Sequence, residues 1–307
     1  MNKSGNDILL LLFDEKELLS AKATERNVDV CTAFKRFNSV FVLLIRKYYL
    51  LLRLPYPEIW FGEWVKYFKK NNYSIIIIHA SNSSRFIADY ISNYTKNRVI
   101  FWYWNPVVGS VDPNKVTNPK IEKWSFDKAD CIKYNMKYNT QYYFENIEIS
   151  NNTPEQDVFF VGADKGRLAS LLRLEKQFND LNITTYFHIT PTTHWLKNKI
   201  KSNFKPRISY ENVLQLISQS KSILDIVQEN QSGLTLRPME ALMFSKKLIT
   251  NDSEIAEYDF YHKNNIFILG KDNLEYLSLF INTPYHQIDD NIKNQYDFSN
   301  WILNFLN

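Results

Sequence analysis

The chemistry-bearing residues that stand out most in this sequence lie between Ile223 and Glu240. A buried strand is expected to end near Gln228. A helix is expected to begin near Thr235, with Pro238 in its first turn, where a missing backbone NH costs nothing. Such a helix start presents backbone NH groups and a positive dipole end to an anion. The pattern predicts a diphosphate site formed by the turn and the first helical residues, namely Ser232, Gly233, Leu234, Thr235 and Arg237.

Glu240 follows Arg237 by three residues, so both side chains are expected on one side of the helix. A carboxylate just beyond a phosphate loop is well placed to accept the two hydroxyl groups of a ribose. The alternative is that Arg237 and Glu240 form an ordinary ion pair within their own helix, as such residues commonly do. The ribose interpretation predicts that Glu240→Ala weakens nucleotide binding and leaves the fold intact.

A second loop, Phe160 to Arg167, is expected between the first strand and the first helix of the same domain. Gly162 and Gly166 allow a tight turn, and Lys165 and Arg167 provide positive charge. Loss of a nucleoside diphosphate builds negative charge on the leaving group, so fixed cations beside it lower the barrier. The alternative is a solvated basic turn with Arg167 on a helix face.

The elements that must position these residues follow from an alternation of apolar runs of strand length with amphipathic stretches of helix length. In the second half, strands are expected at 157–161, 183–189, 223–228, 247–250 and 265–269. Helices are expected between and after them, at 166–181, 210–220, 238–244, 254–261 and 274–281. In the first half, strands at 74–79 and 99–104 flank a helix at 84–93. This order is typical of α/β domains with parallel sheets.

Length and composition indicate two domains. The chain has 307 residues, 45% of them apolar, which suits two domains near the usual ~150 residues. We expect a first domain at 1–150, a second domain at 151–290 and a C-terminal helix at 291–307 that packs back on the first domain. A polar, turn-rich hinge is expected at 148–156.

Cysteine content, hydropathy and charge indicate the cellular location and the kind of partner. Cys31 and Cys131 are too few for a disulfide framework or a Cys-rich metal site, which favours the cytoplasm. The N-terminus lacks the layout of a signal peptide, and no stretch reaches the ~18 apolar residues of a spanning helix. The net charge of +4 speaks only weakly for an anionic partner.

The run from Gly233 to Ala241, Gly-Leu-Thr-Leu-Arg-Pro-Met-Glu-Ala, resembles the donor-binding motif of GT-B glycosyltransferases. Members of that class have two Rossmann-like domains with a cleft between them, so the resemblance implies an N-terminal acceptor-binding domain at 1–150 and a C-terminal nucleotide-sugar donor-binding domain at 151–290. The resemblance implies that Glu240 binds the ribose of a nucleotide-sugar, that 233–235 lie at the donor phosphates, and that the loop at 160–167 supplies a Lys or Arg to them. Retaining members often carry a second glutamate eight positions earlier. That position here is Ser232, so the stereochemistry stays open.

Two segments, Val99 to Pro106 and Trp124 to Asn135, also resemble a group of bacterial glycosyltransferases of lipopolysaccharide, O-antigen and capsule biosynthesis. This resemblance covers roughly residues 74–305. It implies transfer of a sugar from a nucleotide-diphosphate sugar to a growing, lipid-linked cell-surface polysaccharide at the inner face of the cytoplasmic membrane. We expect no metal or other cofactor, because cationic side chains and backbone NH groups can stabilise the diphosphate.

The candidate catalytic residues lie in the first domain. His79 and Asn105 stand at predicted strand ends, where ligands of open α/β sheets bind. Transfer with inversion needs a base that takes the acceptor's proton, and His79 suits that role. The alternative is a buried histidine with satisfied hydrogen bonds. Asp130 is a further candidate base, and Asp89 and Asp127 are equally suitable by residue type.

Residues 34–70 combine basic and aromatic side chains. We expect a helix over 35–53, on which five cations share about a third of the circumference: Lys35, Arg36, Arg46, Lys47 and Arg53. The opposite side is apolar, with Val40, Phe41, Leu44, Tyr48 and Leu51. Such a surface suits peripheral contact with an anionic membrane. The alternative is a helix packed on its own domain with its charges in water.

Two rival classes of function stay open. A non-catalytic glycan-binding or partner subunit would keep the fold and lack donor turnover. A nucleic-acid-binding protein is disfavoured, because only one region is basic and no recognised motif accompanies it. We therefore expect no nucleic-acid partner.

Overall fold

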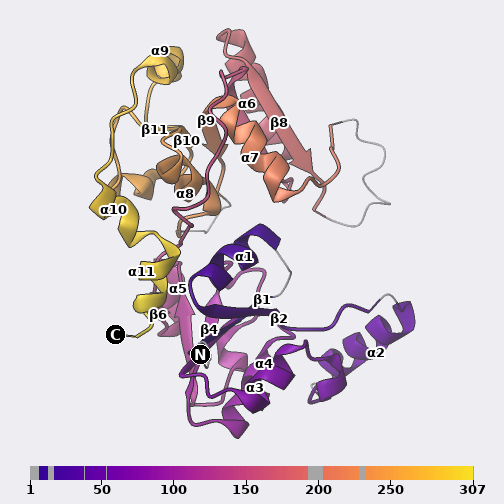
Figure 1. Cartoon of the computed structure of the whole chain (residues 1–307). Helices are drawn as coiled ribbons and strands as arrows, with labels where there is room; N and C mark the ends of the chain where they lie inside the picture. Colours follow the sequence, from indigo (N-terminus) through magenta and orange to yellow (C-terminus); the bar gives the residue numbers. More distant parts are fainter. Residues whose placement is uncertain are drawn as a thin grey trace. The chain divides into compact units, whose positions relative to one another are not determined.

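The computed structural model describes residues 7–12, 17–37, 39–52, 54–192, 203–227 and 232–306. The chain forms two compact units, Met1–Thr140 and Gln141–Asn307, each built on one sheet (Figure 1). All strand pairs within both sheets are parallel. The predicted α/β class with two parallel-sheet domains is confirmed.

The first unit contains a six-stranded sheet in the order β2-β1-β3-β4-β5-β6. Its strands are β1 (Ile8–Leu12), β2 (Val28–Thr32), β3 (Ile75–His79), β4 (Arg98–Tyr103), β5 (Ile121–Ser125) and β6 (Lys137–Tyr138). The four isoleucines of β3 are all buried although they alternate between the two faces. Both faces of the sheet are therefore covered at its centre, as is usual for parallel sheets.

Five helices and two 3-10 turns surround this sheet within the described residues: α1 (Glu17–Glu25), α2 (Val40–Leu51), η1 (Glu58–Trp60), α3 (Trp64–Lys70), α4 (Arg85–Tyr94), η2 (Pro113–Lys115) and α5 (Lys128–Tyr134). Helix α4 shows why they form. It buries Ile87, Ala88 and Ile91, spaced to make one apolar face, against β4 and β5. The predicted helix at 84–93 and the strands around it are confirmed.

Helix α2 differs from the prediction for this region. It begins at Val40 rather than near residue 35, so Lys35 and Arg36 are not on it. The cause is a competing pairing, because Phe34 bridges Phe61 and the Lys35 amide donates to the carbonyl of Trp60 at 3.0 Å. Arg53 lies outside the described residues.

The second unit contains a five-stranded sheet in the order β11-β10-β9-β7-β8. Its strands are β7 (Gln156–Ala163), β8 (Thr185–Thr190), β9 (Ser220–Asp225), β10 (Lys247–Thr250) and β11 (Ile266–Ile268). All five strands expected from the sequence are present. Read from β8, the chain order is 2-1-3-4-5, so the winding direction reverses between β7 and β9. Ligands of doubly wound sheets bind outside the carboxyl ends of the strands at such a switch point.

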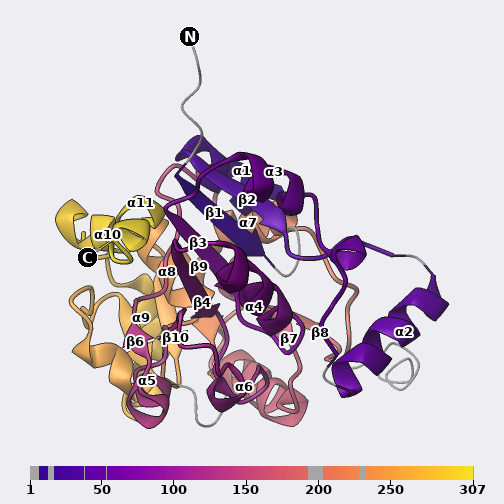
Figure 2. The ribbon, with the colours of Figure 1, turned by 90° about the horizontal axis from the view of Figure 1, so that it is seen from below.

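The helices of this unit are α6 (Leu168–Asp180), α7 (Tyr210–Ser218), α8 (Leu236–Met243), α9 (Leu277–Asn282), α10 (Asp290–Gln295) and α11 (Phe298–Leu303), with 3-10 turns η3 (Ser253–Glu257) and η4 (Leu274–Tyr276). Helix α8 packs on β9 and β10 (Figure 2). Helix α7 packs on β7 and β9. The helix predicted at 254–261 is wrong, because only one 3-10 turn forms there, opened by the Asp252 carboxylate that caps Glu254.

The C-terminal helix α11 packs on an aromatic segment near the start of the second unit. Phe298 stacks on Phe144, Trp301 lies 4.2 Å from the ring of Tyr142, and the amide of Phe298 donates to the carbonyl of Tyr143 at 2.8 Å. Contact of residues 291–307 with the first domain stays a prediction.

Candidate functional site

Two loops leave the carboxyl ends of neighbouring strands at the switch point of the second sheet. One follows β7 and holds residues 164–167, and the other follows β9 and leads to α8. Strands β7 and β9 are paired in parallel, with Phe159 opposite Ile223, so both loops emerge at the same edge. The structure therefore brings together the two segments that the sequence marked as donor loops.

The loop after β7 has a constrained backbone. Lys165 and Gly166 both have positive φ, +47° and +83°, which costs about 1 kcal/mol or more at a residue with a Cβ atom. The amide of Lys165 donates to the hydroxyl of Thr192, and the Asp164 carboxylate accepts from the amide of Leu168 at 2.7 Å. These bonds fix the turn in front of α6.

Arg167 is held close to the strand end. Its guanidinium lies 5.7 Å from the centre of the Phe160 ring, and its Nη2 donates to the carbonyl of Ala163 at 3.4 Å. A Cβ atom on Gly162 would lie only 3.7 Å from this Nη2 and 3.2 Å from Phe160, so glycine leaves room for both side chains. The Nε of Arg167 is buried, and no described group accepts a hydrogen bond from it. Burial lowers the pKa of Arg167, and attraction to Asp225 acts in the opposite direction.

The loop after β9 is organised by Asp225, the last residue of the strand. Its carboxylate accepts a 2.8 Å hydrogen bond from the hydroxyl of Thr235, and the Thr235 hydroxyl also accepts from the amide of Arg237 at 3.2 Å. Thr235 is thus the N-cap of α8, as its position in the sequence suggests. Strand β9 ends three residues earlier than predicted, so Asp225 is a site residue that the sequence interpretation missed.

Asp225 links the two loops electrostatically. Burial raises its pKa to about 6, while the Thr235 hydroxyl, Arg237 and Arg167 oppose that rise. Lys165 is also attracted by Asp225, although withdrawal from water and repulsion from Arg167 lower its pKa overall. The cations of the first loop and the helix start of the second therefore face one carboxylate. A bound anion would compete with that carboxylate for the same cations.

Asp225 should make the protein less stable as the pH rises. Its pKa is higher in the folded chain than in the unfolded chain, so the folded state binds the proton more tightly and loses that advantage between about pH 4 and pH 6. We expect this group to lower the free energy of unfolding by up to about 3 kcal/mol over that window. Urea unfolding at pH 4, 5, 6 and 7 should show this loss in the wild type and not in Asp225→Asn.

The control is Asp180→Asn, at the exposed end of α6, which we expect to keep the wild-type pH profile. Parallel stability curves for the wild type and Asp225→Asn would contradict the assignment.

Glu240 is completely buried, and its carboxylate already has two partners within the protein. It forms an ion pair with Arg237, whose side chain is 16% exposed, and it accepts a 2.8 Å hydrogen bond from the hydroxyl of Tyr210. Tyr210 in turn lies 2.6 Å from the hydroxyl of Tyr143. Burial and the charge of Glu240 raise the pKa of Tyr210 well above its ordinary value, so this phenol stays protonated and donates. The structure thus contains the i,i+3 ion pair that stood as the alternative to a ribose contact.

The remaining residues of the predicted donor loop lie at the start of α8. Leu234 is buried, whereas Thr235 and Arg237 are partly exposed. Ser232 and Gly233 precede them, and both make interactions with neighbouring groups. Pro238 occupies the first turn of α8, where the sequence placed it.

The three candidate catalytic residues of the first unit lie on segments at the carboxyl ends of β3, β4 and β5. His79 ends β3 and stacks on Trp104 with 5.2 Å between ring centres. Asn105 is exposed in the loop after β4. Asp130 on α5 accepts a 2.8 Å hydrogen bond from the amide of Val107 in that loop, and burial raises its pKa. Asp130 thus also holds this loop in place, and all three residues stay candidates.

Within the residues that the structure describes, no group of three or more His, Cys, Asp or Glu side chains is arranged to hold a metal ion. The expectation that no cofactor is needed stays a prediction.

Comparison with protein families finds no matching family model, and comparison with curated protein sequences finds no match. Solved structures are similar over nearly the whole chain. A sucrose-phosphate synthase from Thermosynechococcus elongatus superposes with a TM-score of 0.61 at 8% identity, covering 97% of this chain and 96% of that one. An alpha-glucosyltransferase in complex with UDP and mismatched DNA has a TM-score of 0.58 at 11% identity, covering 97% and 94%.

A UDP-GlcNAc 2-epimerase from Methanocaldococcus jannaschii, in complex with UDP-GlcNAc and UDP, has a TM-score of 0.51 at 14% identity and covers 97% of this chain and 98% of that one. Identities this low establish the architecture alone. The fold is the GT-B fold of nucleotide-sugar glycosyltransferases, with its two parallel-sheet units.

Proposed function

We propose that the protein is a glycosyltransferase that takes its sugar from a nucleotide-diphosphate donor bound in the second unit. The observation that supports this most directly is the buried, unsatisfied Nε of Arg167 at the switch point of a GT-B sheet. An unpaired buried donor costs about 1–3 kcal/mol, and a phosphate oxygen is a ligand that removes this cost. Two of the similar structures hold UDP, so we propose UDP as the donor's nucleotide.

The residues of this site would act on the leaving diphosphate. Arg167 and Lys165 offset the negative charge that grows as the sugar departs. The start of α8 adds the dipole of its backbone to the same field, and Asp225 keeps Thr235 in place as its cap. Glu240 takes the ribose hydroxyls only if one of its oxygens exchanges Arg237 or Tyr210 for the sugar.

A thermal-shift comparison tests the donor. UDP should raise the melting temperature of the wild type more than GDP or ADP at equal concentration, because a ligand that binds only the folded state stabilises it. Uridine without phosphates is the control and should produce little shift. No shift with any of the three diphosphates would contradict a donor site.

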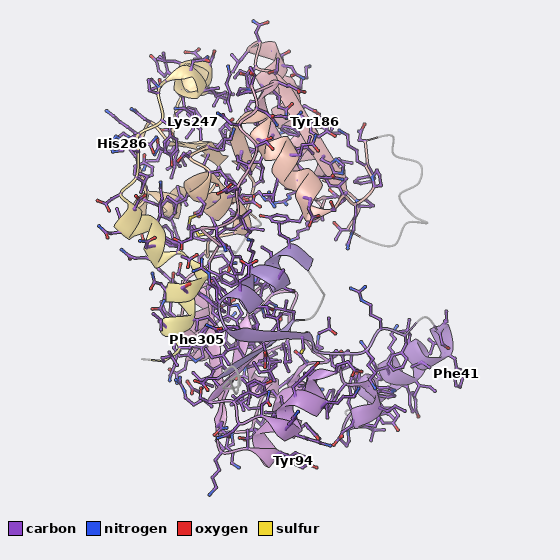
Figure 3. All side chains as sticks on the ribbon, viewed as in Figure 1. Phe41, Tyr94, Tyr186, Lys247, His286 and Phe305 are labelled. Atoms are coloured by element: carbon purple, nitrogen blue, oxygen red, sulfur yellow. The ribbon has the colours of Figure 1, made fainter. Side chains whose placement is uncertain are left out.

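We further propose that the acceptor is a lipid-linked glycan of a bacterial cell-surface polysaccharide, as in lipopolysaccharide or capsule synthesis, and that the protein works at the inner face of the cytoplasmic membrane. Helix α2 supports this. It projects from the sheet of the first unit with Phe41 near its tip (Figure 3), and it contains no buried residue. Five apolar side chains of this helix are open to solvent, with Val40, Phe41, Leu44, Tyr48 and Leu51 58–76% exposed.

Ile45, Tyr49 and Leu50 pack against the core of the first unit, so one side of α2 is anchored there. The apolar patch that the helix leaves in water favours membrane contact. Among the described helices, none has the length and apolar composition needed to cross a bilayer.

Vesicle flotation tests this contact. The double substitution Phe41→Ser and Leu44→Ser should reduce binding to phosphatidylglycerol vesicles at least about tenfold, since each buried side chain contributes about 1.5–3 kcal/mol. The matched control is Ile132→Ser on α5, which removes an apolar side chain that is 85% exposed. Equal losses in both proteins, or no loss in the double variant, would refute a contact through α2.

The rival of a non-catalytic glycan-binding subunit differs in one measurable property. A catalytic protein releases UDP from a UDP-sugar when the acceptor is present, whereas a subunit without chemistry binds glycan and releases none.

A further inference from the structure

A groove of about 500 Å³ runs beside α2 in the first unit. One wall is the segment of α2 from Leu44 to Leu51, and the other is formed by Asn82 and Arg85 at the start of α4 and by Lys115 at the end of η2. The volume lies within the usual range of small-molecule sites. All of its lining residues belong to the first unit, whereas the loops after β7 and β9 belong to the second.

The groove contains three cations and, among the described residues, no carboxylate in its lining. Lys47, Arg85 and Lys115 make no ion pair and no side-chain hydrogen bond with any group that the structure describes. The Nε of Arg85 is buried without a hydrogen-bond partner, while its guanidinium lies 4.6 Å from the centre of the Phe86 ring. The acidic side chain that Arg85 faces is Asp89, whose pKa burial raises and Arg85 lowers. The positive charge is therefore largely uncompensated.

The same groove is apolar along α2. Leu44, Tyr48 and Leu51 are 59%, 58% and 76% exposed, and each lines the groove. A wholly polar anion would make no apolar contact with the α2 wall. A wholly apolar ligand would give the three cations no counter-charge. An amphiphile with a phosphate at one end and a hydrocarbon chain satisfies both walls.

We propose that this groove binds the phosphate-bearing end of a single lipid, the anchor of the acceptor, with the phosphate at Arg85, Lys115 and Lys47 and the first carbons of the chain along α2. This inference rests on the proposed function for its identification of the lipid as the acceptor. The position agrees with that role, because Asn82 follows His79 by three residues and Ser84 donates a 2.7 Å hydrogen bond to the carbonyl of His79. A sugar attached to the phosphate would extend toward the strand end that holds His79.

Farnesyl phosphate in solution is a probe for the groove, measured by titration calorimetry with the full chain. The wild type should bind it, farnesol and inorganic phosphate should each bind at least about tenfold more weakly, and Arg85→Gln with Lys115→Gln should cost about tenfold or more. The matched control is Lys96→Gln, an exposed lysine of the same unit outside the groove, which should bind as the wild type does. Melting temperatures of all variants confirm that they fold.

Three results overturn the proposal: unchanged affinity in the double variant, an equal loss in Lys96→Gln, or binding to phosphatidylglycerol vesicles with none to farnesyl phosphate, which would indicate a membrane surface contact instead. UDP binding separates this inference from the proposed function. The double variant should bind UDP as the wild type does. If the wild type binds farnesyl phosphate and does not bind UDP, the lipid site in the groove is supported and the proposed glycosyltransferase function is contradicted.

Discussion

Arg167→Ala should weaken UDP binding about 10–100-fold without destabilising the protein. A charge-assisted hydrogen bond to phosphate contributes about 1.5–3 kcal/mol, which corresponds to this range of affinity. Stability should change little, because the substitution removes the cost of the buried, unpartnered Nε together with the contacts that Arg167 makes with Phe160 and Ala163. Titration calorimetry with UDP and urea unfolding of the same variant measure the two effects.

Two further variants sharpen this result. Arg167→Lys should recover only part of the affinity, because an ammonium lacks the planar fork of a guanidinium. Arg173→Ala removes an exposed arginine from the same helix, α6, and should bind UDP as the wild type does. If Arg167→Ala keeps wild-type affinity, the loop after β7 does not hold the diphosphate.

Glu240→Ala should destabilise the second unit by about 3–5 kcal/mol, because it leaves the largely buried guanidinium of Arg237 without its partner. The hydroxyl of Tyr210 loses its acceptor in the same step. This result replaces the sequence-based expectation that the substitution leaves the fold intact. Urea unfolding measures the loss. Glu211→Ala, at an exposed position of α7, is the control and should cost less than about 1 kcal/mol.

Glu240→Gln separates stability from ligand binding. The amide keeps an acceptor for Tyr210 and the volume of the side chain, so a larger share of the protein stays folded than with alanine. Weaker UDP binding by this folded variant would support the ribose contact. A Glu240→Ala protein as stable as the wild type would show that the buried ion pair contributes little.

The strands of the second unit could be predicted because each of them is a separate apolar run in the sequence. Segments such as Lys247–Thr250 and Ile266–Ile268 are short apolar runs separated by polar turns, and each pairs in parallel with its neighbour. In the first unit, β1, β2, β5 and β6 escaped prediction. The run of Ile8–Leu12 is mostly leucine, which lacks the β-branched side chains that mark β3 as a strand. Strand β2 carries Asp29, whose carboxylate accepts a hydrogen bond from the distant Tyr73. Such a partner is visible only in three dimensions.

In the candidate site, too, some features could be predicted from the local sequence and others depend on residues far apart in the chain. The positions of Arg167 and of Thr235 as a helix cap follow from local pattern, because strand ends and helix starts are marked by glycine, threonine and proline. The role of Asp225 depends on cations from a loop about sixty residues earlier in the chain, and that of Tyr210 depends on Glu240 thirty residues later. The single acidic residue at the end of an apolar strand was the available signal for Asp225.

The tyrosine pair beside Glu240 has a consequence for handling the protein. Tyr143 meets Tyr210 through its hydroxyl, while its backbone is clamped by Tyr296 and Phe298, at 2.9 and 2.8 Å. The residues just before and within α11 thus hold the backbone of Tyr143, whose hydroxyl contacts the Tyr210 hydroxyl that donates to Glu240. A truncation that removes residues 296–306 would therefore loosen the surroundings of the Glu240 carboxylate, so the shortened chain is a poor choice for testing the proposed donor site.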